Sequence, residues 1–538
     1  MAALRAITMI TQKRCGKVKG RTCANGRPQR KYTNKEDASS PTLAAESLLI
    51  TLAIDAIEGR DVATADIVGA YLNAYMDELV HMKFTGEMVN YVVQSNPDKY
   101  NEYVTEEKGQ KVLYVQLSKA LYGCIRSALL WYNLLTETLM EEGFEINPYN
   151  MCVANKEING KQFNICWYVD DLKLSHVDPQ VVTEVIEKIE SKFGKMKVKR
   201  GNKHTYVGID IELTKHGGVT LQNKQYLVEC IEQFGETISR KSATPAARNL
   251  MTKEIKGIPL TKERSERFHS IVMKLLWICK RSRPDIEPAI SFLCTRTHEP
   301  KSDDWRKLKR VLQYIYGTID DKRHFSASSL MIGKMNSWVD VSYATHDDMR
   351  SHTGACISIG NGTIQSTSGK QKLNVKSSTE GEVVGASDKL ANTVWTTNFL
   401  KAQGQEINEN IFHQDNTSAM KIEKNGWISC GQKSRHINIR YFFVKDILKQ
   451  NGIQVEYFPT DLMVEDFFTK PLQGSLFKKF KDVIMVHKPM SSIYRTVQKE
   501  RVGNDSIVEC DINMTSCEKK KSEQVENRKP TWAEIVIK

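Results

Sequence analysis

Long hydrophobic runs are absent from this sequence, and so are paired cysteines. No apolar stretch approaches the roughly 18 residues that a membrane-spanning helix needs, so we expect no membrane partner. The 12 cysteines are scattered singly, without a CxxC pair or zinc-site spacing beside histidine, which is typical of reduced thiols inside a cell. The first residues have no signal-peptide architecture. The sequence therefore predicts a cytoplasmic or nuclear protein.

Positive charge is in excess. Lys and Arg total 77 against 64 Asp and Glu, which gives a formal net charge of +13. A basic surface favours a polyanionic partner, nucleic acid first, although many large soluble proteins are mildly basic without one. With 538 residues the chain is too long for a single hydrophobic core, so we expect several domains.

Hydrophobic periodicity predicts two separate α/β units. In the first unit helices alternate with strands, and KGRTCANGRPQRKY near the N-terminus is interpreted as strand–turn–strand. Three helical segments follow, and a second α/β pattern occupies residues 335–472. Residues 515–530 have the composition of a disordered segment. The predicted helices are 42–58, 128–143, 179–194 and 223–235 in the first unit, and 261–280, 284–298 and 302–317 after it.

Three aspartates of the first unit are candidates for a metal-dependent active site. Asp66 ends the run DVATAD, and Asp170 and Asp171 lie near the tip of a predicted β-hairpin, FNICWYVDDLKLSHV at 163–177. Two divalent cations commonly catalyse phosphoryl transfer by stabilising the attacking and leaving oxygens. Mg²⁺ prefers carboxylate oxygens as its protein ligands. An acidic pair in a turn is commonly no more than solvated turn chemistry, but the large β-forming residues before this pair favour a rigid tip.

Six ordered motifs resemble the reverse transcriptase of copia-type LTR retrotransposons and the segment that follows it. The resemblance spans residues 1–475 and implies an RNA-directed DNA polymerase that uses an RNA template, a DNA primer and dNTPs. It implies two Mg²⁺ ions per active site, with Mn²⁺ as a substitute, and residence in the cytoplasm, the nucleus or virus-like particles. The motifs are DIVGAYLNA (66–74), LSKALYGC (117–124), YVDD (168–171), FGKMKVKRGNKHTYVGIDIE (193–212), RSRPDIEPAISFL (281–293) and WRKLKRVLQYIYGT (305–318).

The same resemblance implies roles for individual residues. The three aspartates correspond to catalytic metal ligands. Tyr71 corresponds to an aromatic residue beneath the incoming sugar that excludes a 2′-hydroxyl, with a core aromatic as the alternative. Lys19 and Arg21 correspond to nucleotide-binding residues of the fingers, with a solvated basic strand as the alternative. Lys197 is a candidate nucleotide-binding residue that protonates pyrophosphate, although other basic residues lie close to it in the sequence.

A second acidic set lies in the second α/β unit. Its carboxylates come in the order strand, helix start, strand and late helix, which is the order of retrotransposon ribonuclease H domains. The resemblance implies a cage for two Mg²⁺ ions that hydrolyses the RNA of an RNA–DNA hybrid. The catalytic and metal-binding candidates are Asp340 in SWVDVSYA, Glu380 in SSTEGE, Asp415 in FHQDNTSA and Asp466 in TDLMVEDFFTKPL.

Basic residues near this second set are candidates for phosphate contacts with the hybrid, although charge runs are usually only solvated faces. His436, in KSRHINIRYFFVKD, either assists product release or is structural, and the structural role is the safer interpretation. The basic candidates are Lys370, Lys372, Lys376, Lys433, Arg435 and Arg440.

The chain departs from the family pattern at three places. After LYG, the usual Pro and the basic residue that follows it are replaced by Ala128 and Leu129, in a stretch that supports the template and the nucleotide. Gly381 stands where Ala is usual, and Glu465 adds a carboxylate to the late helix. These departures keep an alternative open, a decayed or domesticated copy that binds nucleic acid without efficient catalysis.

The predicted fold class is α/β (α+β), a right-hand polymerase of palm, fingers and thumb followed by a helical connection and a ribonuclease-H-like domain. The predicted function is RNA-directed DNA polymerase with ribonuclease H activity. The predicted domains are 1–245 for the polymerase, 246–333 for the connection, 334–475 for the ribonuclease-H-like domain and 476–538 for a polar, partly disordered tail.

Overall fold

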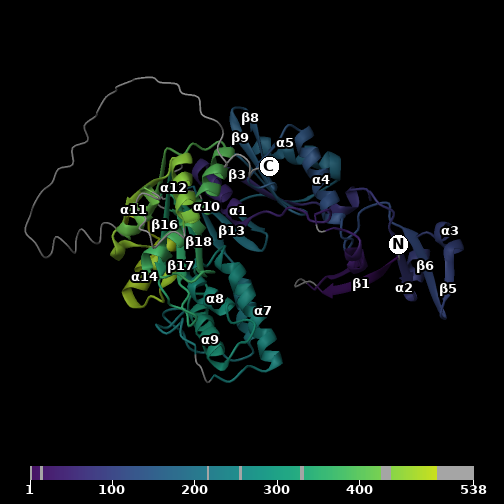
Figure 1. Cartoon of the computed structure of the whole chain (residues 1–538). Helices are drawn as coiled ribbons and strands as arrows, with labels where there is room; N and C mark the ends of the chain where they lie inside the picture. The colour runs from purple at the N-terminus through teal and green to yellow at the C-terminus, as the bar shows by residue number, and fades with distance from the viewer. Residues whose placement is uncertain are drawn as a thin grey trace, which may run out of the picture. The chain divides into compact units, whose positions relative to one another are not determined.

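The computed structural model describes residues 3–12, 16–34, 36–214, 217–253, 257–326, 333–360, 362–425 and 438–492, with the backbone alone at 326, 438–442 and 461. The chain divides into two compact units, Met1–Ile493 and Tyr494–Lys538, and the second lies outside the described residues. Within the described part, the first unit contains four β-sheets with helices packed on them (Figure 1). None of the described helices is long and apolar enough to cross a membrane.

The first sheet contains the N-terminal hairpin. Its strands, in spatial order, are β2 (Val18–Ala24), β1 (Leu4–Gln12), β4 (His81–Thr85), β6 (Gln110–Gln116) and β5 (Val104–Glu107). β1 pairs with β2 from Ala6 to Gln12 but with β4 only at Leu4 and Arg5. The strand–turn–strand prediction was right only for its first strand. After β2 the chain forms a short 3-10 helix, η1 (Arg27–Lys31), because Pro28 has no N–H to give to a strand ladder.

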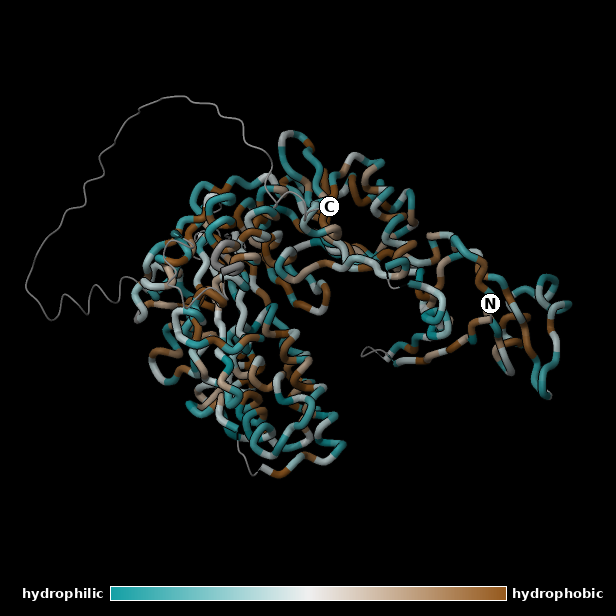
Figure 2. The backbone as a smooth tube through the Cα atoms, viewed as in Figure 1, coloured by the Kyte–Doolittle hydropathy of each residue, from teal (hydrophilic) through white to brown (hydrophobic). Residues whose placement is uncertain are grey.

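The second sheet contains the predicted acidic hairpin. Its strands, in spatial order, are β11 (Lys197–Lys199), β3 (Asp61–Asp66), β10 (Asp171–His176), β9 (Lys161–Tyr168), β8 (Val153–Ile158) and β7 (Glu145–Ile146). The predicted helices at 42–58, 128–143 and 179–194 are confirmed as α1 (Ala45–Glu58), α4 (Ser127–Glu141) and α5 (Pro179–Phe193). They share one hydrophobic core with the sheet, in which Trp131 and Trp167 are buried. Hydrophobic and hydrophilic residues alternate over short distances along the chain (Figure 2).

The third sheet is closed by a strand from much later in the sequence. Its strands are β12 (Lys203–Tyr206), β13 (Ile209–Thr214), β14 (Gly218–Gln222) and β15 (Arg323–Ser326). In the described part of the chain, four α-helices lie between β14 and β15: α6 (Lys224–Phe234), α7 (Lys262–Cys279), α8 (Glu287–Cys294) and α9 (Ser302–Gly317). They confirm the helices predicted from the sequence in this stretch, although α8 is shorter than predicted. The β14–β15 pairing crosses the predicted domain boundary at 245/246.

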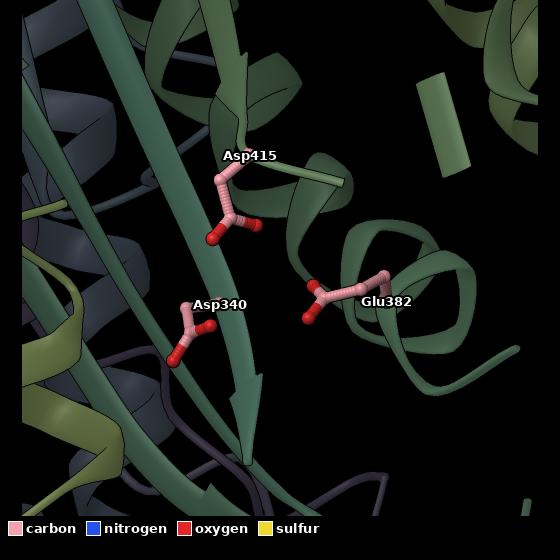
Figure 3. A group of neighbouring side chains, drawn as sticks. All are labelled: Asp340, Glu382 and Asp415. Carbon is pink, nitrogen blue, oxygen red and sulfur yellow. The ribbon is translucent and has the colours of Figure 1, made fainter. Parts of the chain in front are cut away.

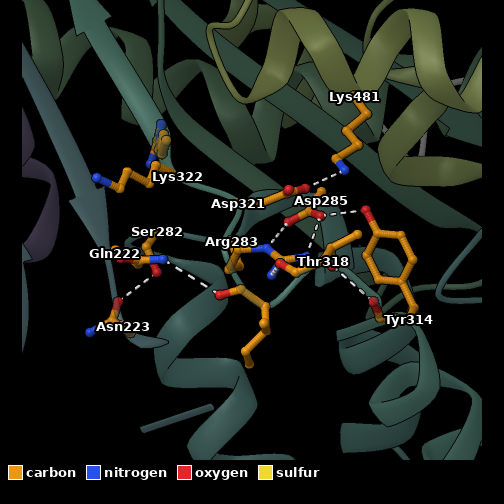
Figure 4. Close-up of polar contacts among 12 residues, drawn as sticks. Gln222, Asn223, Ser282, Arg283, Asp285, Tyr314, Thr318, Asp321, Lys322 and Lys481 are labelled. Atoms are coloured by element: carbon orange, nitrogen blue, oxygen red, sulfur yellow. Dashed lines mark hydrogen bonds and ion pairs between the residues drawn. The ribbon is translucent and has the colours of Figure 1, made fainter. Parts of the chain in front are cut away.

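A buried polar network ties these helices together (Figure 4). The Arg283 guanidinium donates two hydrogen bonds of 2.8 Å to the Asp285 carboxylate and one of 2.9 Å to the Thr318 carbonyl. The Tyr314 hydroxyl donates to the same carboxylate at 2.6 Å. Although burial acts to raise it, the pKa of Asp285 is lowered by the adjacent Arg283 charge. The RSRPD motif is therefore structural, with its two charges paired and hydrogen-bonded in the interior.

The fourth sheet lies in the predicted second α/β unit and contains both parallel and antiparallel strand pairs. Its strands, in spatial order, are β18 (Gly362–Lys370), β17 (His352–Ile359), β16 (Lys334–Ser342), β19 (Glu409–Gln414) and β20 (Gln454–Tyr457). β16 runs antiparallel to β17 and parallel to β19. The long helix α10 (Ser378–Ala402) packs against β16. The remaining helices of this part are α11 (Thr417–Asn425), α12 (Asn438–Gln450), α13 (Asp466–Thr469) and α14 (Gly474–Ile484).

Helix α14 lies across the predicted start of the tail at residue 476. Its Phe477 and Phe480 side chains are buried, and Phe477 packs against Tyr314 and Phe467. Lys481 of the same helix forms a 2.5 Å ion pair with Asp321. The beginning of the predicted polar tail is thus an amphipathic helix packed into the first unit.

Candidate active sites

Strand register brings the first acidic set together. Asp171, the first residue of β10, lies directly opposite Asp66, the last residue of β3. Asp170 occupies the turn before β10, and its carbonyl accepts a hydrogen bond of 3.0 Å from the Ile67 amide. Residues directly opposite each other in an antiparallel pair have Cβ atoms about 5 Å apart. The predicted hairpin is confirmed, and the three predicted aspartates lie at one end of the sheet.

The turn that carries Asp170 is held in an unfavourable backbone conformation. Val169 has a φ of 61°, which a β-branched residue rarely adopts. The Trp131 indole N–H donates to the Val169 carbonyl at 2.7 Å. The buried Tyr206 hydroxyl donates to the Cys166 carbonyl at 3.1 Å and to the Asp171 carbonyl at 3.3 Å. Neither anchor was identified from the sequence; together they fix the hairpin tip despite its strain.

The acidic residues of this site repel one another. Burial, followed by the charges of Asp170 and Asp66, raises the pKa of Asp171 to about 6. Burial also raises the pKa of Asp170, with Asp66 adding to the effect. Half-buried carboxylates that are crowded in this way are stabilised by any cation that reaches them.

The predicted nucleotide-binding residues surround these carboxylates. The Lys197 ammonium lies 2.9 Å from Asp66 Oδ2, because β11 pairs with β3 and places the two residues opposite each other. The positive charges of Arg21 and Lys19, on β2, lie close enough to Asp170 to act against the rise of its pKa. All three cations therefore belong to the neighbourhood of the aspartates.

Tyr71 follows Asp66 in a short 3-10 helix, η2 (Ala70–Asn73). Its ring stacks on that of Tyr122, with centroids 5.7 Å apart and planes at 26°. The Arg21 guanidinium lies over the other ring of this pair, 6.0 Å from the Tyr122 centroid. Burial raises the pKa of Tyr71, and Tyr122 and Asp170 add to the effect, so the phenol lies near the acidic turn. Tyr71 is packed on one side and still adjoins the site, and Tyr122 is a neighbour that the sequence did not single out.

Asp55 and Lys173 form a buried ion pair beneath this site. Both side chains have 0% exposure, and Lys173 Nζ lies 2.5 Å from Asp55 Oδ2. Lys173 is two residues after Asp171 on β10, while Asp55 belongs to α1. The pair therefore connects the hairpin strand to the helix behind the sheet.

Three carboxylates, two of them from the predicted second acidic set, lie close together beside the fourth sheet (Figure 3). Among the described residues, Asp340, Glu382 and Asp415 form a group in which one oxygen of each lies within 4.8 Å of the others. Asp340 lies on β16, Glu382 on α10, and Asp415 directly after β19. Burial raises the pKa of Glu382 and of Asp415, and the Asp340 charge adds to both effects.

The predicted Glu380 is not in this group, and Glu382 takes its place. Ser377 is the N-cap of α10, and its hydroxyl accepts a hydrogen bond of 3.2 Å from the Glu380 amide. The Glu380 carboxylate in turn accepts from the Lys376 amide at 2.8 Å, so it caps the helix start. Two residues later the helix has turned by roughly 200°, and Glu382 accepts from the Val341 amide of β16 at 3.2 Å.

Asp466 lies beside Asp340. Burial, followed by the Asp340 charge, raises the pKa of Asp466 to about 7. Lys470 Nζ is 2.5 Å from Asp466 Oδ1 and 3.8 Å from Asp340 Oδ2, so one cation bridges the two carboxylates. The Thr469 hydroxyl donates to Asp340 Oδ2 at 2.5 Å. Helix α13 supplies Asp466 and Thr469 to this site, and Lys470 directly after it supplies the cation.

Two more carboxylates near this set are buried. Glu465 and Glu423 each have 0% exposure, and no hydrogen bond is made to their carboxylate oxygens within the described residues. Burial raises the pKa of Glu423 to about 7 and also raises that of Glu465. The sequence had singled out Glu465 as an extra carboxylate, but it gave no signal for Glu423.

The predicted phosphate-contacting cations are only partly described. Lys370 forms a 2.5 Å ion pair with Asp348, so its charge is already compensated. Lys372 and Lys376 are exposed. Lys433, Arg435 and His436 lie outside the described residues, and only the backbone is described at Arg440.

Comparison with known proteins identifies relatives of this chain. Residues 7–248 match the reverse transcriptase (RNA-dependent DNA polymerase) family. The retrovirus-related Pol polyprotein from transposon TNT 1-94 of Nicotiana tabacum is 23% identical over 478 residues, covering 87% of this chain and 34% of the relative. That from transposon RE2 of Arabidopsis thaliana is 24% identical over 472 residues, covering 87% and 31%. The chain thus spans about a third of the length of these relatives.

Among solved structures, the foamy viral protease-reverse transcriptase in complex with double-stranded DNA has a TM-score of 0.47 and 12% sequence identity. The similarity covers 86% of this chain and 66% of that chain.

Proposed function

The chain belongs to the copia-type retrotransposon Pol polyproteins, and from this premise we propose that it is an RNA-directed DNA polymerase with ribonuclease H activity. The observation that carries the polymerase proposal is the register of Asp171 opposite Asp66, with Asp170 in the adjoining turn. All three lie within the matched residues 7–248. The proposed partners are an RNA template, a DNA primer, dNTPs and the RNA–DNA hybrid product.

The donor set of the first site fits Mg²⁺. Its ligands are carboxylate oxygens, and the crowding that raises the pKa of Asp171 is the situation that a divalent cation relieves. Asp66, Asp170 and Asp171 would hold two Mg²⁺ ions, or Mn²⁺ in their place. When bound, such ions activate the primer hydroxyl and stabilise the leaving pyrophosphate.

The remaining residues of the first site act on the nucleotide. Lys19 and Arg21 provide positive charge beside Asp170, where it would neutralise the triphosphate. Tyr71, supported from behind by the Tyr122 ring, provides a rigid surface for the sugar. The Tyr71 ring, held in place by Tyr122, would exclude the 2′-hydroxyl of a ribonucleotide by steric contact. This contact favours dNTPs over NTPs.

The ribonuclease H proposal rests on the Asp340, Glu382 and Asp415 group with Asp466 beside it. Burial and the Asp340 charge raise the pKa of the other three carboxylates, and four acidic groups placed in this way fit two Mg²⁺ ions, or Mn²⁺. The ions would activate water for hydrolysis of the RNA strand. Lys470 and Thr469 hold the Asp340 and Asp466 carboxylates in place.

A second candidate is a decayed copy that binds nucleic acid without efficient catalysis. The observation that favours it is the departure at Ala128 and Leu129, since Leu129 packs against the hydrophobic core of the second sheet and offers no charge to a phosphate. Primer extension on poly-rA/oligo-dT and degradation of a labelled hybrid, both with Mg²⁺, distinguish the two.

We expect both activities in the parent protein. Asp170→Asn combined with Asp171→Asn should lower primer extension by orders of magnitude and leave hybrid degradation intact, because the second site has its own carboxylates. Hybrid binding without either activity would support the decayed copy. Loss of both activities in a variant that keeps the parent's melting temperature would contradict two independent sites.

A further inference from the structure

A chain of hydrogen bonds connects two buried histidines to helix α13. His346 Nε2 lies 3.0 Å from His352 Nδ1, and His352 Nε2 lies 2.8 Å from Ser368 Oγ. The Ser368 hydroxyl then donates to the Phe468 carbonyl at 2.7 Å. Both histidines are at most 3% exposed. None of these residues belongs to either proposed active site.

The direction of every bond in this chain follows from its last acceptor. A carbonyl cannot donate, so the Ser368 proton goes to Phe468 and the Ser368 oxygen must accept from His352 Nε2–H. The neutral His352 ring then carries no proton on Nδ1, which accepts from His346 Nε2–H.

Burial keeps both rings neutral. It lowers the pKa of His352 to about 3, with the His346 and Lys389 charges adding to the effect. It lowers the pKa of His346 to about 4, with Lys370 adding to the effect. Each ring therefore has one donor and one acceptor at neutral pH, as the chain of hydrogen bonds requires.

The chain is anchored at its base. Ser368 belongs to β18, and its backbone amide donates to Glu287 Oε1 of α8 at 3.1 Å. The Ser366 hydroxyl, two residues earlier on the same strand, donates to Glu287 Oε2 at 2.6 Å. His346 stacks on Phe292 of α8, with ring centroids 6.4 Å apart. The Ser368 hydroxyl, which donates to α13, therefore lies on a strand that is held to α8.

Helix α13 needs such an anchor. It has four residues, too few to be stable from local hydrogen bonds alone. Phe468 lies in its last turn, where carbonyls have no partner within the helix. The helix packs closely on Gly354 of β17, where an added Cβ would lie 2.8 Å from Phe468 Cβ. Gly354 is directly opposite Asp340 in the sheet, so a small shift of α13 moves Asp466 relative to Asp340.

We propose that His346, His352 and Ser368 form a positioning relay that holds α13, and with it Asp466 and Thr469, against Asp340. The proposal rests on the proposed function of the second site. It adds three positioning residues that would act on the metal-binding carboxylates through the Phe468 carbonyl.

The test compares Ser368→Ala with Ser366→Ala in the full chain. Both changes remove one hydroxyl from β18, in a stretch that hydrogen-bonds to Glu287, but only the first removes a bond to α13. Two readouts are measured: hydrogen–deuterium exchange of the α13 amides without metal, and hybrid cleavage as a function of Mg²⁺ concentration. Ser368→Thr, which keeps the hydroxyl, serves as the rescue.

We expect Ser368→Ala to speed exchange at Phe468, Thr469 and Lys470. We also expect it to raise the Mg²⁺ concentration for half-maximal cleavage by about tenfold, the lower end for residues that orient metal ligands. Ser366→Ala keeps the Ser368 amide bond to Glu287 and every bond of the relay, so it should stay close to the parent in both readouts. Ser368→Thr should also stay close to the parent, and primer extension should be unchanged. His352→Phe should behave as Ser368→Ala does.

Equal exchange of α13 in Ser368→Ala and Ser366→Ala would overturn the relay. Faster exchange with an unchanged Mg²⁺ requirement would also overturn it, because the bond would then be structural only. If the parent protein cleaves no hybrid at all, the proposed ribonuclease function fails, and the exchange measurement still decides whether the relay holds α13.

Discussion

Lys197 lies opposite Asp66 in the second sheet, with its ammonium 2.9 Å from the carboxylate. The lysine occupies a position at which a cation can compensate Asp66, and it is 71% exposed, so it can withdraw into solvent. An exposed ion pair of this kind contributes about 0–1 kcal/mol. A metal ion that binds Asp66 therefore displaces a weak competitor.

Lys197→Met should tighten Mg²⁺ binding to the nucleotide-free protein, by at most about fivefold, which corresponds to about 1 kcal/mol. Titration calorimetry measures the effect, and it requires Asp340→Asn in the background to silence the second site. Lys199→Met is the control, because Lys199 lies opposite Thr64 on the same strand. Weaker Mg²⁺ binding in Lys197→Met would mean that the lysine does not compete with the metal.

Glu382 and Glu380 should differ sharply in ribonuclease activity. Glu382→Gln removes a carboxylate from the Asp340 group, so hybrid cleavage should fall by at least 100-fold. Glu380→Gln keeps an acceptor for the Lys376 amide, so cleavage should stay within a few-fold of the parent. Gel assays of a labelled hybrid measure both. The reverse order of the two variants would restore Glu380 as the metal ligand.

Tyr71→Ala should admit ribonucleotides, because the stacked ring is replaced by open space above Tyr122. The ratio of dNTP to NTP incorporation should fall by about one to two orders of magnitude, the range for removal of one steric contact worth roughly 1–3 kcal/mol. Tyr71→Phe keeps the ring and should keep the ratio. If Ala and Phe give the same ratio, Tyr71 is a packing residue.

Asp55→Ala should destabilise the protein strongly. It leaves the Lys173 charge unpaired at 0% exposure, at a cost of about 3–5 kcal/mol. The double variant Asp55→Leu with Lys173→Met removes both charges and should recover most of the lost melting temperature. Thermal unfolding of the three proteins gives the comparison. A double variant as unstable as the single one would show that packing, not the unpaired charge, sets the cost.

The sequence predicted the elements that depend on local pattern. The hairpin around Asp170 was predictable because large β-forming residues flank it, and the main helices followed from periodicity and capping. The sequence did not distinguish Glu380 from Glu382, because two glutamates at i and i+2 on a helix start look alike, while the N-cap decides which of them faces the sheet. The roles of Tyr206 and of the Lys173–Asp55 pair depend on contacts between segments that are distant in the sequence. No local sequence pattern predicts such contacts. Helix α14 was missed although Phe477, Phe480, Val483 and Ile484 do repeat at helical spacing, because the polar residues around them resemble a tail.

The late strand β15 also sets an order of events during synthesis. β14 leaves the ribosome about a hundred residues before Arg323–Ser326, the segment that pairs with it. During that interval β14 has an open edge, and an open edge can recruit strands from other chains. A nascent chain that stops within helices α7 to α9 would therefore be prone to aggregate. A protein truncated at residue 245 should aggregate under conditions in which a protein that extends past residue 326 stays in solution. We therefore expect slow translation through this stretch to lower the yield of folded protein.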